Sequence, residues 1–400
     1  MGVLGFGRYA VSRCVLVAML AGCGGSQPPI SAPGAMPPST TYTQKSRAHS
    51  ASRPATAVHY VYVTNDGSGN VSAYAIDAKS GALTQVQGSP FAAGPEPWGI
   101  AVDPTGKFAY VTNVTDGGTS GASGSVSAYA INASSGVLTQ LKGSPFPSGG
   151  IEPWEMTIGP AGRFAYVTNF YSDNVSAYAI DAKSGALTQV QGSPFGTGAT
   201  PAGVAIDPTA RFAYVANGGS ASVSAYAKRS GALTQVTGSP FAAGSYPWGV
   251  TVDPRGKFAY VTNYDSGSVS AYAIDAESGA LTQVQGSPFA AGSGPFGIAI
   301  DRAGPFLYVV NLHSDTVSAY LINPSSGVLT QVQGSPFAAG TDPYGVAIDP
   351  SGKFAYVANA YWGSSFGTIS AYRIKRNGAL MQVKGSPFEA GGGPVQLAIR

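Results

Sequence analysis

The chain has 400 residues, and 44% of them are hydrophobic while only 10% are charged. Its formal net charge of +3 is unevenly placed, because residues 1–57 carry five basic side chains and no acidic one. Residues 58–400 therefore hold 17 basic and 19 acidic groups, a net charge of −2. A nearly neutral body without a basic stripe argues against nucleic acid as a partner.

The first 22 residues have the composition of an export signal. Two arginines precede a short apolar run at 15–20, which is too short to span a bilayer. The next residues, Leu20-Ala21-Gly22-Cys23, resemble the cleavage box of bacterial lipoproteins. This resemblance implies cleavage before Cys23 and lipidation of its sulfur. We expect an exported, membrane-anchored lipoprotein on the periplasmic or cell-surface side, and in the outer membrane if the cell is Gram-negative. The alternative is an ordinary secretory signal.

Residues 23–57 are rich in Pro, Ser, Ala and Thr and show no apolar period. Such a stretch cannot bury enough apolar surface to offset its ordering entropy, so we expect an extended tether. The other cysteine, Cys14, lies in the export signal, and the mature chain is expected to contain no disulfide. This divides the chain into a signal peptide (1–22), a lipidated tether (23–57) and a folded domain (58–400).

The folded domain repeats one pattern seven times. Each copy opens with Tyr-Val-x-Asn and continues through Val-Ser-Ala-Tyr, Ser-Gly-Ala-Leu-Thr-Gln and Gly-Ser-Pro-Phe, with small changes. The opening tyrosines are Tyr62, Tyr110, Tyr166, Tyr214, Tyr260, Tyr308 and Tyr356. A fixed period of this length predicts a repeat architecture.

Each repeat holds four short runs of strand composition, separated by turn residues. In the second copy they are residues 99–102, 108–112, 126–131 and 138–141. Four antiparallel strands per repeat predict an all-β, seven-bladed β-propeller. The folded domain begins with a second strand near Tyr60 and ends with an unpaired first strand at 394–399. We therefore expect the last strand to join the first blade and close the ring, which also removes exposed sheet edges; the alternative is an open solenoid.

The Tyr-Val-Thr-Asn, Asp-Pro-(Thr/Ser)-Gly-Lys-Phe and Ser-Gly-(Ala/Val)-Leu-Thr-Gln motifs resemble the YVTN and lactonase-type propellers, including the 6-phosphogluconolactonase-like group. The resemblance covers residues 58–400. It implies a lactone hydrolase with His and Arg beside the first strand and Glu just after the second. This sequence departs from that pattern, because the first-strand entries lack His and Arg and only Asp66 is acidic after a second strand. The remaining catalytic candidates are Glu155, Asp66 and His313, and no cofactor or metal site is expected.

Ligand-binding candidates occupy repeat positions that vary. The residue that enters the first strand is aromatic in five copies, and the residue after it is glycine in five copies but Glu155 and Gln396 in the other two. Two loops between the second and third strands are enlarged, and one carries aromatic residues. The binding candidates are Trp98, Trp154, Glu155, Trp248, Phe296, Tyr344, Gln396, Tyr361 and Trp362. The aromatic set forms either a ligand-binding rim at the channel mouth or a hydrophobic plug between blades.

Because the expected His/Arg/Glu set is missing, the sequence favours a non-catalytic binding or interaction module. Its partner would be a carbohydrate-like small molecule or an envelope protein, and the module is expected to be a monomer. The alternative is a sugar-lactone hydrolase of the 6-phosphogluconolactonase-like type. A second alternative is a structural envelope protein.

Overall fold

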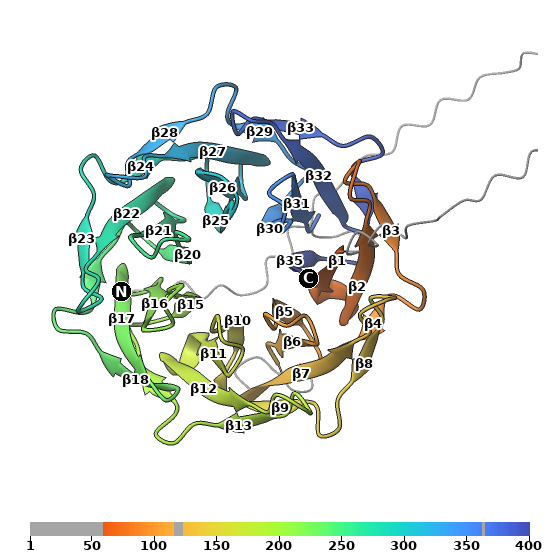
Figure 1. Cartoon of the computed structure of the whole chain (residues 1–400), viewed down its shortest axis with the longest axis horizontal. Helices are drawn as coiled ribbons and strands as arrows, with labels where there is room; N and C mark the ends of the chain where they lie inside the picture. The colour runs from red at the N-terminus through yellow and green to blue at the C-terminus, as the bar shows by residue number, and fades with distance from the viewer. Residues whose placement is uncertain (1–58, 116–122, 362–364) are drawn as a thin grey trace, which may run out of the picture. The chain divides into compact units, whose positions relative to one another are not determined.

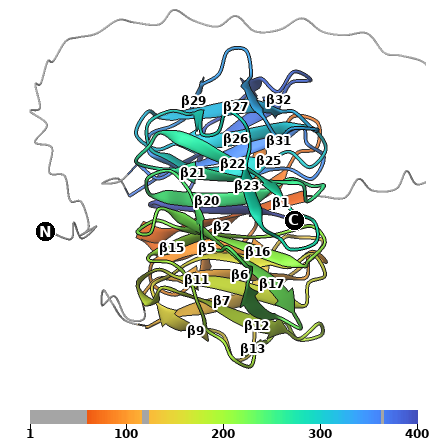
Figure 2. The same cartoon turned by 90° about the vertical axis from the view of Figure 1, so that its left-hand side faces the viewer.

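The computed structural model describes residues 59–115, 123–361 and 365–400, all of which lie in one compact unit, Ala57–Arg400. In this part of the chain, seven five-stranded antiparallel sheets surround a central channel (Figure 1). Figure 2 shows the same ring edge-on. The predicted all-β, seven-bladed propeller is confirmed.

In every blade four strands run outwards from the channel, and a fifth, short strand pairs with the third. Blade 1 contains β35 (Pro394–Ile399), β1 (His59–Asn65), β2 (Asn70–Ile76), β3 (Leu83–Gln85) and β4 (Phe91–Ala92). Blade 2 contains β5 (Pro97–Val102), β6 (Phe108–Asn113), β7 (Ser123–Ile131), β8 (Leu138–Gln140) and β9 (Phe146–Ile151). Blade 3 contains β10 (Pro153–Ile158), β11 (Phe164–Asn169), β12 (Asn174–Ile180), β13 (Leu187–Gln189) and β14 (Phe195–Gly196).

The other four blades repeat this order. Blade 4 contains β15 (Pro201–Ile206), β16 (Phe212–Asn217), β17 (Ser222–Arg229), β18 (Ala232–Gln235) and β19 (Phe241–Ala242). Blade 5 contains β20 (Pro247–Val252), β21 (Phe258–Asn263), β22 (Ser268–Ile274), β23 (Leu281–Gln283) and β24 (Phe289–Ala290). Blade 6 contains β25 (Pro295–Ile300), β26 (Phe306–Asn311), β27 (Thr316–Ile322), β28 (Leu329–Gln331) and β29 (Phe337–Ala338). Blade 7 contains β30 (Pro343–Ile348), β31 (Phe354–Asn359), β32 (Thr368–Ile374), β33 (Leu380–Gln382) and β34 (Phe388–Glu389). Two 3₁₀ turns, η1 (Asp66–Ser68) and η2 (Phe170–Ser172), follow the second strands of blades 1 and 3.

The short fifth strand of each blade was not predicted from the sequence. In blade 1 it is β4, which pairs with β2 beyond the end of β3. The preceding Gly-Ser-Pro segment returns to the third strand because its serine side chain bonds there. The Ala73 N–H donates to Ser89 Oγ at 2.8 Å, and the same bond recurs between Ala128 and Ser144 in blade 2.

The ring closes as predicted. The last strand, β35, pairs antiparallel with β1, with Val61 opposite Ile399 and Val63 opposite Leu397. Figure 1 shows β35 beside β1, although the two strands lie at opposite ends of the described chain. Because the ring is closed, the innermost strand of blade 1 lies between two neighbouring blades, as every other inner strand does.

Buried tyrosines join every blade to its neighbours. The second-strand tyrosine of each repeat donates its hydroxyl to a glycine carbonyl in the next blade. These pairs are Tyr62–Gly136, Tyr110–Gly185, Tyr166–Gly231, Tyr214–Gly279, Tyr260–Gly327, Tyr308–Gly378 and, across the closure, Tyr356–Gly81. Buried hydroxyls without partners are costly, so the repeated tyrosine both fills the space between blades and fixes their spacing.

The loops form two distinct faces. The residue after each second-strand asparagine donates its N–H to the carbonyl of the residue before the inner-strand proline of the same blade, as in Val114–Glu96 (3.0 Å) and Tyr264–Tyr246 (2.9 Å). The loops that precede the inner strands and those that follow the second strands therefore share one face, which we call the mouth face. The turns after the first and third strands lie on the opposite face, the underside. No helix among the described residues is long and apolar enough to cross a membrane.

Candidate functional site

Five aromatic side chains close the channel at the mouth face. Their ring centroids are 4.2 Å apart for Trp98 and Trp154, 5.1 Å for Trp154 and Trp248, and 4.4 Å for Trp248 and Phe296. Phe296 and Tyr344 are separated by 4.9 Å, and Tyr344 returns to Trp98 at 5.7 Å. We call these five residues the aromatic plug. Trp98 and Phe296 are buried and the other three are half-buried, so the rings fill the mouth rather than surround an open hole.

All five plug residues occupy the same position of the repeat. Each of its members directly follows the proline that starts an inner strand, where seven strands converge. In the other two blades the position is held by Ala202 and Val395, which are buried. Ala202 lies in blade 4 between Trp154 and Trp248, and its small side chain lets these two larger rings meet.

Glycine is common at the position that follows the plug residue on each inner strand, because little space is available there. A Cβ on Gly99 would lie 2.4 Å from the Trp154 carbonyl oxygen, and one on Gly297 would lie 2.4 Å from the Tyr344 carbonyl oxygen. Neighbouring inner strands therefore approach too closely for an ordinary side chain. Glu155 and Gln396 are the two exceptions, so their backbones must make room for side chains inside the ring.

The hydrogen bond from this position to a second-strand threonine is longer where the residue is not glycine. In blade 2 the Gly99 N–H donates to Thr112 Oγ1 at 2.8 Å. The equivalent bonds lengthen to 3.1 Å from Glu155 to Thr168 and 3.2 Å from Gln396 to Thr64. The longer bonds are consistent with strands displaced to admit the two polar side chains.

Glu155 and Gln396 come together although they belong to blades 3 and 1. The Gln396 Nε2 donates to Glu155 Oε2 at 3.4 Å, across the inner strand of blade 2. Burial raises the pKa of the half-buried Glu155 carboxyl to about 8, and a bond from the Met156 N–H opposes this only in part. A carboxyl with such a pKa can exchange a proton near neutral pH.

One hydrogen-bond donor of the aromatic plug is left without an acceptor. The Trp154 Nε1 is buried and has no hydrogen-bond partner among the described residues. A buried N–H without an acceptor costs free energy, which a bound oxygen atom would recover. Glu155, Gln396 and Trp154 thus supply one ionisable group and two N–H donors at the mouth end of the channel.

The other two catalytic candidates lie outside the channel. Asp66 begins η1 in the mouth-face loop of blade 1, and its N–H donates to the Gly393 carbonyl at 2.9 Å. His313 Nε2 lies 2.7 Å from the Tyr264 hydroxyl in the loops of blades 5 and 6. Asp315, close to His313 in sequence, accepts the Asp342 N–H instead. The structure therefore brings neither residue onto an inner strand with Glu155.

The remaining binding candidates lie in the enlarged loop of blade 7. Tyr361 is 55% exposed, and Phe366 in the same loop is 65% exposed. Trp362 and the insert at 116–122 lie outside the described residues. Tyr361 is thus available on the mouth face but belongs to a loop rather than to the plug.

The underside end of the channel has different chemistry, which was not predicted from the sequence. A cavity of about 1000 Å³ opens there, and its walls include Val204, Val250, Ile298 and Leu397 from four inner strands. These residues directly follow Gly203, Gly249, Gly297 and Gln396, which hold the repeat position of Glu155, so the cavity ends one layer below Glu155. The aliphatic residues that recur along each inner strand could have predicted this lining.

Repeated aspartates on the underside serve the turns. Asp103 Oδ1 accepts the N–H groups of Lys107 at 2.7 Å and Phe108 at 2.6 Å, and Asp349 bonds Phe354 in the same way. These bonds show that the aspartates stabilise the turns. Within the described residues, no group of three or more His, Cys, Asp and Glu side chains could hold a metal ion.

A family model described as lactonase, seven-bladed β-propeller, matches residues 47–200 and 191–294. The chain belongs to this lactonase family. The propeller also resembles a candidate 6-phosphogluconolactonase from Bacteroides uniformis, with 20% identity, a TM-score of 0.74, and coverage of 86% of this chain and 100% of the other. The periplasmic gluconolactonase PpgL of Pseudomonas aeruginosa shows 22% identity and a TM-score of 0.72, over 86% of this chain and 99% of its own. No curated protein matches this chain.

Membership of the lactonase family corrects the function expected from the sequence. The prediction of a non-catalytic binding module is wrong, because the family supports the sugar-lactone hydrolase alternative better. The prediction relied on the missing His and Arg at the first strands. It gave too little weight to Glu155, whose environment makes it a carboxyl suited to acid–base chemistry.

Proposed function

We propose that this lactonase-family protein hydrolyses a sugar lactone, with Glu155 as the general base. The observation that carries the proposal is the Glu155 carboxyl inside the ring, with a pKa raised to about 8 and with Gln396 beside it. Family membership supplies the reaction class. A general base is most effective when its pKa lies near the working pH, because it is then both available and basic.

The reaction needs one base and donors for the developing oxyanion. Ionised Glu155 takes a proton from water as the water oxygen attacks the lactone carbonyl carbon. The Trp154 Nε1–H and the Gln396 Nε2–H are the donors available to the carbonyl oxygen as it becomes negative. The ring C–O bond then breaks, and the proton held by Glu155 passes to the leaving oxygen, giving the open hydroxy acid.

The charge of the mouth face favours a lactone without phosphate. The mouth-face loops of the described chain contain no Lys or Arg, while Glu96, Glu152 and Asp342 all lie beside the inner-strand prolines. A phosphate group there would find no cation and would be repelled by these carboxylates. We therefore favour a neutral aldonolactone, for which the aromatic rings offer apolar faces to the sugar.

The plug must open for this chemistry from the mouth side. The Trp98 and Trp154 rings lie only 4.2 Å apart and stand between the mouth loops and the layer of Glu155. Substrate entry therefore requires these two rings to separate, a side-chain movement that half-buried Trp154 can make more readily than buried Trp98.

The proposal is tested by following acid release from glucono-δ-lactone in a pH-stat. We expect hydrolysis above the buffer rate, and at least a roughly 100-fold loss in Glu155→Gln. Asp66→Asn and His313→Gln are matched controls that should retain activity, and 6-phosphogluconolactone should be the poorer substrate. Absence of turnover with both lactones, or full activity in Glu155→Gln, would reject the assignment.

We also propose that the protein is exported and tethered through a lipid on Cys23, with residues 23–57 as the tether to the propeller at 58–400. The lipoprotein-type box supports this proposal, and the similar Pseudomonas protein is described as periplasmic. Because acyl chains supply the membrane affinity, Cys23→Ser should move the protein from the membrane to the soluble exported fraction. Membrane association that persists in Cys23→Ser would contradict the anchor.

A further inference from the structure

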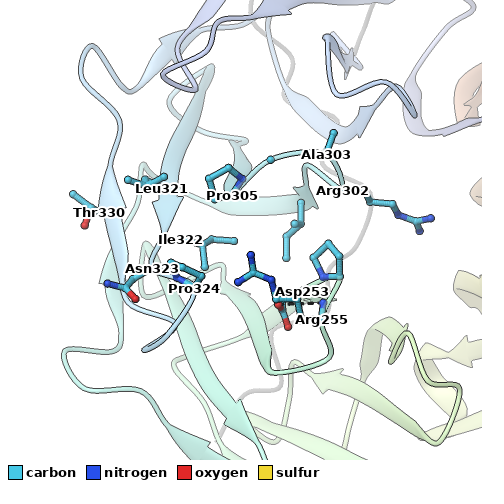
Figure 3. A pocket seen from close by; sticks show the side chains of 13 residues that line it. Asp253, Arg255, Arg302, Ala303, Pro305, Leu321, Ile322, Asn323, Pro324 and Thr330 are labelled. Carbon is cyan, nitrogen blue, oxygen red and sulfur yellow. Dashed lines mark hydrogen bonds between the residues drawn. The ribbon is translucent and has the colours of Figure 1, made fainter.

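A pocket of about 500 Å³ lies on the underside between blades 5 and 6 and adjoins the channel cavity, with which it shares Pro254, Ile300 and Arg302 (Figure 3). Blade 5 contributes Asp253, Pro254 and Arg255 from its first turn. Blade 6 contributes its own first turn, 301–305, and the end of its third strand with the following turn. The pocket is distinct from the mouth site, since no residue of the plug and neither Glu155 nor Gln396 lines it.

The pocket coincides with departures from the repeat. Arg302 stands where the other described first turns have proline, and Pro305 stands where they have lysine or arginine. Leu321 replaces an alanine found at this position in blades 1 to 5, and Pro324 replaces the alanine of blades 1, 2, 3 and 5. All four substituted residues line the same pocket. Residues that the propeller fold itself requires would recur in all blades. The clustering of these four substitutions therefore indicates a role specific to this blade.

The substitutions build an apolar wall. Leu321 is 43% exposed and pairs with Thr330 across the outer part of blade 6. Figure 3 shows Leu321, Pro305, Ile322 and Pro324 around the pocket. An alanine at position 321 and a lysine at position 305, as in other blades, would leave this surface smaller and more polar.

Two arginines border the pocket without partners in the described protein. Figure 3 shows the Arg255 side chain directed towards Ile322 and Pro324, whereas Arg302 points away from them. Neither the Arg255 nor the Arg302 guanidinium has a hydrogen bond or an ion pair to the residues that the structure describes. Arg211, on the same face, instead donates to the carbonyls of Ala276 at 2.9 Å and Glu277 at 3.1 Å.

The carboxylates nearest the two arginines are already engaged. Asp253 is buried and accepts the Phe258 N–H at 2.8 Å, and the buried Asp301 accepts the Ala303 N–H at 2.8 Å. Both carboxylates therefore serve their own turns rather than the guanidinium groups. The pocket retains the Arg255 guanidinium beside an apolar wall.

We propose that this pocket binds a small organic carboxylate whose body is apolar. A guanidinium group recognises a carboxylate through two parallel N–H bonds, and Arg255 can hold the anionic head in this way. The volume lies in the range of small-molecule pockets, which combine apolar walls with a few polar groups. A polyhydroxylated aldonate fits poorly, because its hydroxyls would face Leu321 and Pro324 without acceptors. The ligand therefore differs from the product of the proposed hydrolysis.

The test titrates the full protein with 3-phenylpropionate by isothermal calorimetry. The neutral 3-phenylpropan-1-ol and the hydroxylated gluconate serve as comparators for charge and for the apolar body. Arg255→Thr installs the residue that blades 2 and 4 carry, and Leu321→Ala installs the common alanine, so both variants keep residues that the fold accepts. Two variants serve as controls: Arg302→Ala, whose side chain points away from the apolar wall, and Arg163→Ala, an underside cation outside the pocket.

We expect saturable binding of 3-phenylpropionate that exceeds binding of the alcohol and of gluconate. Arg255→Thr should weaken it by about tenfold or more, and Leu321→Ala by a few fold. Arg302→Ala, Arg163→Ala and Glu155→Gln should bind as the wild type does, and the last of these separates this site from the proposed hydrolase. No saturable binding, equal binding of the alcohol, or unchanged affinity in Arg255→Thr would overturn the proposal.

Discussion

The two ends of the channel are built by the same seven inner strands, but they differ in regularity and charge. At the mouth, the second and third residues of each strand vary among aromatic, small, glycine and polar side chains, and the nearby loops of the described chain contain no Lys or Arg. At the underside, the last residue of every inner strand is valine or isoleucine, and the turns carry cations such as Lys107, Arg211 and Lys353. One end is filled by aromatic rings, whereas the other opens into an aliphatic cavity.

This difference shows how a repeat protein separates scaffold from site. Positions that must pack alike in every blade stay alike, because each has the same neighbours in the ring. Positions that differ between blades are free of that requirement and can carry chemistry. Glu155 and Gln396 at the mouth, and Arg302 at the underside, are such positions.

The largest change removes both ends of the channel at one blade. Deleting residues 394–400 takes away Gln396, Leu397 and Ile399 and leaves β1 with an open edge. We expect the free energy of unfolding to fall by about 5 kcal/mol or more, which is most of the stability of an ordinary domain. Urea unfolding measures this loss, with Gln396→Gly as the control that keeps the strand. A truncated protein with the wild-type midpoint would contradict the closed ring.

Two substitutions on one strand compare the filled end with the open end. Trp154→Ala removes a ring packed at 4.2 Å on Trp98 and 5.0 Å on Phe170, and should cost about 3 kcal/mol of stability. Ile158→Ala, at the underside end of β10, borders the cavity and should cost only about 1 kcal/mol. Urea unfolding of both variants decides the comparison. Equal losses would mean that the plug contributes no more packing than the aliphatic lining.

The pH dependence of stability isolates the mouth carboxyl. The pKa of Glu155 is raised from 4.5 to about 8 in the folded protein, which therefore keeps a proton that the unfolded chain releases. This contribution to stability is complete below pH 4.5 and is lost as the pH rises towards 8. Between about pH 5 and 8 the wild type should lose about 2 kcal/mol more than Glu155→Gln, after allowance for a half-buried group. Parallel pH profiles for the two proteins, measured by urea unfolding, would place the carboxyl in water rather than inside the ring.

The smallest expected effect concerns the threonine that ties neighbouring inner strands together at the mouth. Thr112 Oγ1 donates to the Trp154 carbonyl at 2.7 Å and accepts the Gly99 N–H. Thr112→Ala should cost about 1 kcal/mol, because buried backbone groups lose their partner. The reciprocal change, Ala216→Thr in blade 4, should stabilise by a similar amount, and calorimetric melting temperatures report both. A destabilised Ala216→Thr variant would show that blade 4 uses different packing.

The sequence by itself determined the repeat, the number of blades, four of the five strands in each blade and the closure by residues 394–399. These features follow from local composition and from the repeat period, which recur in every copy. It also identified the position that forms the plug, since three of the four tryptophans occupy it. The short fifth strand was missed because its pairing depends on a serine side chain meeting the third strand, as Ser89 does with Ala73.

Only the tertiary structure decided how positions from different blades meet. Glu155 and Gln396 are 241 residues apart, and no spacing rule could place their side chains 3.4 Å from each other. The raised pKa of Glu155 arises from atoms packed around it by several blades, and the plug exists because ring closure brings five aromatic residues together. The pocket of Arg255 and Arg302 likewise depends on the contact between blades 5 and 6. Local sequence sets each strand, but distances between blades are set by the packing of the closed ring.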